Sequence, residues 1–198
     1  MAKSPFQSIL DKNQFFIEDL RKKSAAWIYT EVEKLQKQRI TPNVFMKDNT
    51  NKQSSFILPG NLYFYAYNPK TKDTLPYYDA YPLVFPFTKT NDGWIGLNMH
   101  YLPYNLRIQL FDALWSLRKN NKLDATNRLK LSWATIQSLS KFNLAQPCVK
   151  RYLFTHMTSV PIIIESEHWL TALMLPIQRF KKQNDQYIWG DSIKQSRK

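Results

Sequence analysis

The stretch Asn61-Leu62-Tyr63-Phe64-Tyr65-Ala66-Tyr67 decides the fold class of this chain. Its aromatic and apolar residues favour extended backbone, and the alternation puts three tyrosines on one face and Leu, Phe and Ala on the other. Pro59-Gly60 directly before it is typical of a turn. The stretch therefore predicts a β-strand, with a loop following over residues 68–81.

Two more strands are predicted shortly after the first. Residues 83–87 and 94–100 flank Asn91-Asp92-Gly93, which is a strong turn signal, so the two segments form a hairpin. Later in the chain, residues 160–164 are a short β-branched run and residues 170–177 return to apolar character. We expect both to be strands, although the second run also suits a helix.

Helices are expected on either side of these strands. Apolar residues three or four apart predict one long amphipathic helix within residues 13–38, ended by Thr41-Pro42, and the polar run 47–55 then reads as a loop. Pro103 suits the first turn of a helix that reaches about residue 118. Further helices are predicted at 125–141, capped by Asp124, and at 148–156, opened by Pro147.

The expected fold class is α+β. It consists of a small curved antiparallel sheet of about five strands, a partly open barrel, with a helical insertion and an N-terminal helix. We divide the chain into an N-terminal helix and loop (1–58), a single α+β domain (59–178) with the helical insertion at 103–158, and a basic C-terminal tail (179–198). The last two strands need the first three to pair, so one cooperative unit is expected.

The positive charge of the chain is unevenly placed. The net charge is +13, and residues 105–160 hold nine Lys and Arg against two carboxylates. Residues 53–104 are neutral, and residues 179–198 hold six cations against two carboxylates. So few nearby carboxylates leave most cations unpaired, which favours a polyanionic or acidic partner over a merely solvated helical face.

The candidate binding residues for nucleic acid or an acidic partner are the cations of the insertion and the tail. They are Arg107, Arg118, Lys119, Lys122, Arg128, Lys130, Lys150, Arg151, Arg179, Lys181 and Lys182. Taken singly, each is an ordinary exposed or helix-capping cation worth a few tenths of a kcal/mol. The tail is either a flexible arm that contacts phosphate or a solubilising end. Tyr63, Tyr65 and Tyr67 are able to stack on bases, but packing inside the protein is the favoured interpretation.

Catalytic chemistry finds little support in the sequence. Three scattered histidines and the single cysteine, Cys148, form no metal-ligand pattern and no nucleophile pair, and Cys148 is expected in the core of a protein from a reducing compartment. The acids Asp73, Asp79 and Asp92 lie in predicted loops, where a nuclease would need them to converge. We expect no enzyme activity, no catalytic residues, no metal, no cofactor, no small-molecule substrate and no membrane span.

The sequence resembles proteins of T-even-like contractile-tailed phages. The resemblance lies in residues 59–79 with 81–84, in Gly96-Leu97-Asn98-Met99-His100-Tyr101-Leu102-Pro103, in Pro147-Cys148-Val149-Lys150-Arg151-Tyr152-Leu153, in Leu175-Pro176-Ile177-Gln178-Arg179-Phe180, and in Trp189 and Asp191-Ser192. It covers most of residues 59–192 and implies a virion protein, with the DNA end protector family as the first candidate and a baseplate or tail subunit as the second. Residues 1–58 carry none of these motifs.

Two functional hypotheses follow. In the first, a non-enzymatic virion protein binds double-stranded DNA or its ends by phosphate contacts during head or particle completion. In the second, a structural baseplate or tail assembly subunit docks its basic face on acidic neighbouring proteins. Either way the expected partners are other phage virion proteins, with DNA added in the first case, and the expected location is the virion, with the host cytoplasm during assembly.

Overall fold

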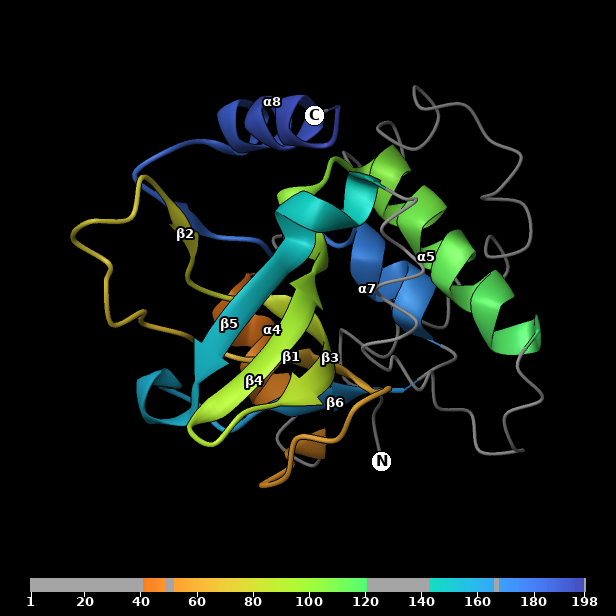
Figure 1. Cartoon of the computed structure of the whole chain (residues 1–198). Coiled ribbons are helices and arrows are strands. Elements are labelled where there is room, and N and C mark those ends of the chain that lie inside the picture. The colour runs from red at the N-terminus through yellow and green to blue at the C-terminus, as the bar shows by residue number, and fades with distance from the viewer. Residues whose placement is uncertain (1–40, 49–51, 121–142, 166–167, 198) are drawn as a thin grey trace.

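The computed structural model describes residues 41–48, 52–120, 143–165 and 168–197 (Figure 1). The helices predicted at 13–38 and 125–141 lie outside these residues. The described chain contains an antiparallel sheet with the order β5-β4-β3-β1-β6. Its strands are β1 (Leu62–Phe64), β3 (Leu83–Lys89), β4 (Gly93–Asn98), β5 (Val149–Leu153) and β6 (Ile162–Ile164). The α+β class and the five-stranded antiparallel sheet are confirmed, and the sheet is open because β5 and β6 remain its two edges.

The predicted hairpin forms the centre of the sheet. β3 pairs with β4 with Lys89 opposite Trp94, and the turn between them closes through a hydrogen bond from the Thr90 amide to the Gly93 carbonyl. The register shifts between Pro86 and Thr88, where β3 carries a bulge. The turn signal in the sequence therefore specified this part of the fold correctly.

The two faces of the sheet bury different side chains because neighbouring residues of a strand point in opposite directions. Leu62 and Phe64 join the main hydrophobic core, whereas Tyr63 and Tyr65 join a second cluster with Trp94. Both tyrosines are fully buried, and Tyr67 is 8% exposed. The three tyrosines thus pack inside the protein, as favoured from the sequence, and of the three only Tyr67 keeps any exposed area.

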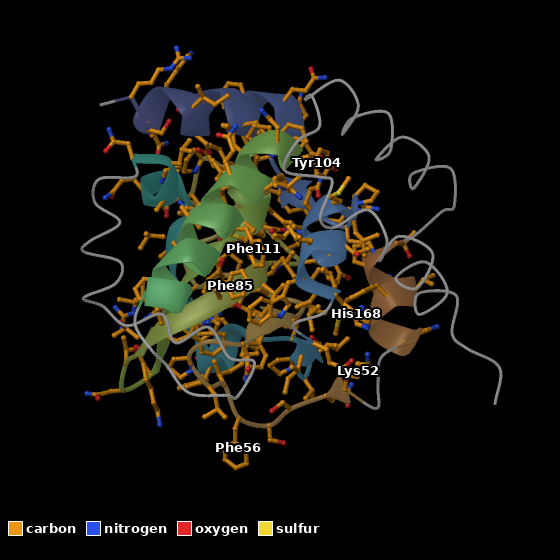
Figure 2. The ribbon with its side chains drawn as sticks, turned by 90° about the vertical axis from the view of Figure 1, so that its right-hand side faces the viewer. Lys52, Phe56, Phe85, Tyr104, Phe111 and His168 are labelled. Atoms are coloured by element: carbon orange, nitrogen blue, oxygen red, sulfur yellow. The ribbon has the colours of Figure 1, made fainter. Side chains whose placement is uncertain are left out.

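Helices cover the face of the main core. α5 (Tyr104–Asn120) confirms the helix predicted after Pro103, and α7 (Trp169–Met174) packs beside it. Rings from the two helices meet Phe85 of β3: its centroid lies 6.2 Å from Phe111 and 5.0 Å from Trp169. Figure 2 shows Phe85 and Phe111 inside this layer, whereas Phe56 projects away from it and is 76% exposed.

Two elements of the second half differ from the prediction. The predicted helix 148–156 is the end of η5 (Asn143–Cys148), then β5, then η6 (Phe154–His156). Pairing with β4 outweighs local helix propensity here, with Tyr152 opposite Trp94. The predicted strand 170–177 is instead helix α7 followed by an extended segment, because an apolar run without a clear period fits a buried helix equally well.

The C-terminal segment is folded and is not a flexible arm. A two-stranded sheet joins β2 (Tyr78–Asp79), in the predicted loop 68–81, to β7 (Phe180–Lys181). Helix α8 (Asp185–Gln195) follows; the Asn184 side chain caps its first turn and Ile188 is fully buried. A further short helix, α4 (Pro42–Asp48), begins where the first helix was expected to end, since Pro is well suited to a first helical position.

Candidate nucleic-acid interface

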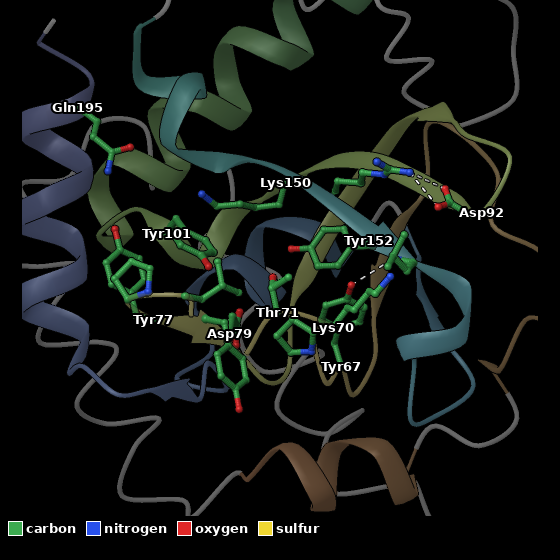
Figure 3. A pocket seen from close by; sticks show the side chains of 16 residues that line it. Tyr67, Lys70, Thr71, Tyr77, Asp79, Asp92, Tyr101, Lys150, Tyr152 and Gln195 are labelled. Atoms are coloured by element: carbon green, nitrogen blue, oxygen red, sulfur yellow. Dashed lines mark hydrogen bonds and ion pairs between the residues drawn. The ribbon is translucent and has the colours of Figure 1, made fainter. Parts of the chain in front are cut away.

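A cavity of about 630 Å³ has four walls (Figure 3). They are β5, β2, the end of α8 and the segment between β1 and β2. It lies at the end of the sheet face that holds the buried tyrosines, so Tyr67 and Tyr152 belong both to that cluster and to the cavity wall. Tyr77, Tyr78 and Tyr101 complete the aromatic lining. Five tyrosines around one cavity give planar surfaces with polar edges, which suits a flat polar ligand.

Hydrogen bonds hold the walls of the cavity in place. The Tyr77 hydroxyl donates to Asp191 of α8, and the Gln195 amide donates to the same carboxylate over 2.9 Å. Burial and the neighbouring Asp191 carboxylate raise the pKa of Tyr77, so its hydroxyl keeps its proton. On the opposite side, the Leu153 amide donates to the Tyr67 hydroxyl over 3.1 Å. The loop after β1 is thereby fixed to both α8 and β5.

Three cations line this cavity together with two carboxylates. Arg151 donates to both oxygens of Asp92 over 2.8 Å, so this pair is satisfied at the surface. Asp79 is buried and bound to protein donors. Lys70 and Lys150 therefore have no carboxylate partner within the part of the chain that the structure describes.

Lys150 is the most unusual of these cations. It is half-buried, and its ammonium lies 4.3 Å from the centroid of the Tyr101 ring, in the range of a cation–π contact. Figure 3 shows its side chain extending above Tyr101. Burial lowers the pKa of Lys150, which means that the charged form lacks solvation that an anion in the cavity would replace.

Comparison with known proteins identifies the family to which this chain belongs. Residues 8–195 match the family described as phage T4 terminal DNA protecting protein. The chain belongs to this family. No match is found among curated proteins or among solved structures. The phage resemblance noted in the sequence is thus confirmed, and for the terminal DNA protecting family in particular.

In this member of the terminal DNA protecting family, the predicted site residues lie in different surroundings. Lys150 and Arg151 line the cavity, while Lys181 is exposed on β7, opposite the cavity residue Tyr78. The side chains of Arg118, Lys119, Lys122, Arg128 and Lys130 lie outside the described part of the chain. Whether the cations of the insertion share one face therefore stays a prediction.

Two other predicted cations bind backbone carbonyls. Lys182 donates to the carbonyls of Asp73 and Leu75 over 2.9 and 2.7 Å, which anchors the loop before β2. Its own φ of 73° is rare for a residue with a side chain, so its position is held by this contact and by the turn. Arg179 is exposed and donates to the carbonyls of Pro176 and Gln178. Carbonyls do not neutralise charge, so both residues remain cationic surface.

The prediction that Arg107 belongs to a binding surface is wrong, because this residue is fully buried. Its guanidinium donates to the carbonyls of Leu102 and Leu173 over 2.6 and 3.1 Å, and its central carbon lies 4.4 Å from the centroid of the Tyr104 ring. It therefore joins α5 to the end of α7. Counting charge along the sequence cannot separate such an interior cation from an exposed one.

Lys70 and most of the cavity tyrosines were not predicted as site residues. The lining comes from segments far apart in the chain, so no local pattern marks it. The sequence shows only a high density of aromatic residues near Lys70 and Lys72. In the described residues no group of three His, Cys, Asp or Glu side chains is placed to hold a metal ion. Among the described helices, none has the length and apolar character needed to cross a membrane.

Proposed function

We propose that this protein is a non-enzymatic virion component that binds the ends of double-stranded DNA through phosphate contacts while the phage head or particle is completed. The observation that supports it most is the pair Lys70 and Lys150 at an aromatic cavity, two cations without a carboxylate partner among the described residues, in a member of a terminal DNA protecting family. Other virion proteins are further partners, and the host cytoplasm is the place of assembly. The family favours this function over a baseplate or tail subunit.

Phosphate contact is the mode of binding that these residues suit. Lys70 and Lys181 are exposed, and Arg151 is held at the surface by Asp92. Such side chains bind the regularly spaced charges of a DNA backbone and release counterions, but they read little base sequence. Affinity is therefore expected to depend strongly on salt and weakly on sequence.

The test compares linear duplexes of unrelated sequence over a range of salt concentrations. The double variant Lys70→Gln/Lys181→Gln should lower the slope of log affinity against log salt by about two, since each lost phosphate contact removes about 0.9. The double variant Lys47→Gln/Lys89→Gln is the matched control: it removes the same charge from exposed residues at the ends of α4 and β3. It should bind almost as the wild type does.

Protection of ends is measured with an exonuclease on linear duplex. Wild-type protein should slow digestion, the cavity-side double variant should slow it less, and incubation with Mg²⁺ alone should release no nucleotides. The proposal fails if the wild type has no affinity for linear duplex at moderate salt, or if the two double variants weaken binding equally. Copurification with tails without DNA affinity would support the baseplate or tail hypothesis instead.

A further inference from the structure

Contact with phosphates alone does not need a cavity lined by tyrosines. Lysines on a convex surface would serve, yet here the half-buried Lys150 stands within a cavity of about 630 Å³. Sites for small ligands have volumes of about 300 to 1,000 Å³ and combine apolar walls with a few polar groups. This cavity therefore has the size and lining to hold a base with its sugar and phosphate.

The arrangement of side chains matches the parts of a nucleotide. Tyr77 and Tyr78 contribute half-buried rings to the lining. Tyr67 and Tyr152, which pack edge to face with their centroids 5.0 Å apart, are almost fully buried and each add a small exposed part. Aromatic rings stack on any base, so such a wall accepts nucleotides without choosing a sequence. Lys150 supplies a half-buried cation, and Lys70 supplies a second cation on an exposed part of the lining.

We propose that this cavity receives the terminal nucleotide of a DNA strand, with its phosphate on Lys150 and its base against the tyrosine wall. The proposal rests on the proposed function and adds how an end is distinguished from the interior of a duplex. A base must leave the stack to enter the cavity. A terminal base has one stacking neighbour instead of two, so it leaves at lower cost.

The first test uses wild-type protein and needs no variant to fold. Short duplexes carry the photoreactive base 5-iodouracil at the terminal position or in the middle of the duplex. After irradiation, crosslinks from the terminal base should map to Tyr67, Tyr78 or Tyr152, and crosslinks from the middle base should not. Terminal crosslinks confined to residues outside the cavity would overturn the proposal.

The second test compares an open-ended duplex with the same sequence closed at both ends by hairpin loops. Lys150→Met keeps the aliphatic stem over Tyr101 and removes the charge; it should lose about tenfold in affinity for open ends, a change of 1.4 kcal/mol, and little for closed DNA. Lys89→Met removes the same charge from the exposed end of β3 and should change neither affinity. Circular dichroism and thermal melting confirm that each variant is folded.

The outcomes separate this inference from the function on which it rests. Wild-type protein that binds neither duplex would refute both. Wild-type protein that binds linear DNA, with Lys150→Met and Lys89→Met equally affected on open and closed DNA, would refute the terminal-nucleotide cavity and leave phosphate binding intact. A selective loss on open ends together with cavity crosslinks supports the inference.

Discussion

Nδ1 of His100 lies 2.8 Å from Oδ2 of Asp79, and both side chains are buried. Asp79 also accepts from the Asn98 amide over 3.1 Å and from the Tyr81 backbone amide over 3.0 Å. Burial alone would raise the pKa of Asp79, but His100 and these donors outweigh it and the pKa is lowered. The carboxylate is thus an acceptor, so Nδ1 of His100 carries the proton.

His100 is therefore neutral in the folded protein. Burial lowers its pKa, and the Arg107 guanidinium adds to this, together exceeding the opposite effect of Asp79. Nε2 of His100 is buried and has no hydrogen-bond partner among the described residues. A lone pair is tolerated there more easily than a second N–H, which agrees with the neutral form. The pair joins β2 to η3 (Met99–Tyr101), the short helix that follows β4, and Asp79 also lines the cavity.

The first prediction concerns stability against pH. The pKa of His100 is lower in the folded protein than its ordinary value of 6.5. Below pH 6.5 the unfolded state therefore binds more protons than the folded state. The free energy of unfolding should change little near pH 7 and fall as pH drops below about 6.5, by up to about 1.4 kcal/mol per pH unit for one proton. The lowered pKa of Asp79 adds a further loss below its ordinary 3.8. Urea unfolding across pH measures this.

The control for this prediction is a variant that lacks the titrating group. His100→Asn keeps an N–H donor toward Asp79 and removes the titrating group, so the slope between about pH 7 and pH 5 should become smaller. Equal slopes for His100→Asn and wild type would contradict the neutral, buried assignment.

The second prediction is that Arg107 supports the fold and not DNA binding. Arg107→Met fills similar space but leaves the carbonyls of Leu102 and Leu173 without their donors in the interior. Loss of a buried, multiply bonded cation should cost about 3 kcal/mol, seen as a lower Tm. The folded fraction should bind linear duplex with unchanged salt dependence. A lower salt slope at unchanged Tm would show that Arg107 contacts phosphate after all.

The third prediction uses two glycines in opposite surroundings. A Cβ at Gly93 would lie 1.8 Å from the Tyr152 carbonyl oxygen, so Gly93→Ala must push β5 away from β4 and should cost more than about 3 kcal/mol. At Gly190, within α8, a Cβ would have no neighbour within 4 Å in the described structure. Gly190→Ala should therefore stabilise the protein by about 1 kcal/mol, because Ala favours helix. Chemical denaturation of both variants tests the close approach of β4 and β5.

The sequence predicted elements that are specified locally. The hairpin of β3 and β4 follows from a turn signal between two short runs, and α5 follows from Pro103 and a regular apolar stripe. β5 was missed because its partner β4 is more than fifty residues away in sequence, so the pairing that decides its conformation leaves no local pattern. The sequence predicted which segments carry the positive charge, but not which of their cations are exposed.

The candidate site was less predictable than the fold for the same reason. Tyr67, Tyr101, Tyr152 and Gln195 meet around one cavity although they belong to four separate segments. Spacing along the chain carries no information about such convergence. Lys150 was a candidate from net charge, but its value as a site residue comes from its burial over Tyr101, which only the packing provides.

The fourth prediction concerns the surface pair of Arg151 and Asp92. The Asp92 carboxylate binds the Arg151 guanidinium and competes with phosphate for it. Arg151 lowers the pKa of Asp92 by hydrogen bonding to it. Asp92→Asn removes this competitor and one negative charge at the cavity, so affinity for linear duplex should rise at low salt. Thermal melting should change little because the pair is exposed. Unchanged or weaker DNA binding at equal Tm would argue against phosphate contact by Arg151.

The fifth prediction is that Cys148 is chemically inert in the folded protein. It is fully buried at the end of η5, with Sγ 3.7 Å from the Leu144 carbonyl oxygen. Burial raises the pKa of the thiol to about 12, against smaller opposite effects from Lys150 and Arg107. Since the thiolate is the nucleophile, iodoacetamide should label native protein at mildly alkaline pH only as fast as it unfolds, and urea should accelerate labelling greatly.

The variant Cys148→Ala separates inertness from function. It should lower stability, because a buried side chain is shortened, and should leave affinity for linear duplex and protection against exonuclease unchanged in the folded fraction. Rapid labelling of the native protein, or loss of DNA protection in a fully folded Cys148→Ala variant, would instead make the thiol a functional group. Such a result would count against a protein that acts by binding alone, because a thiol that reacts in the folded state has the character of a nucleophile.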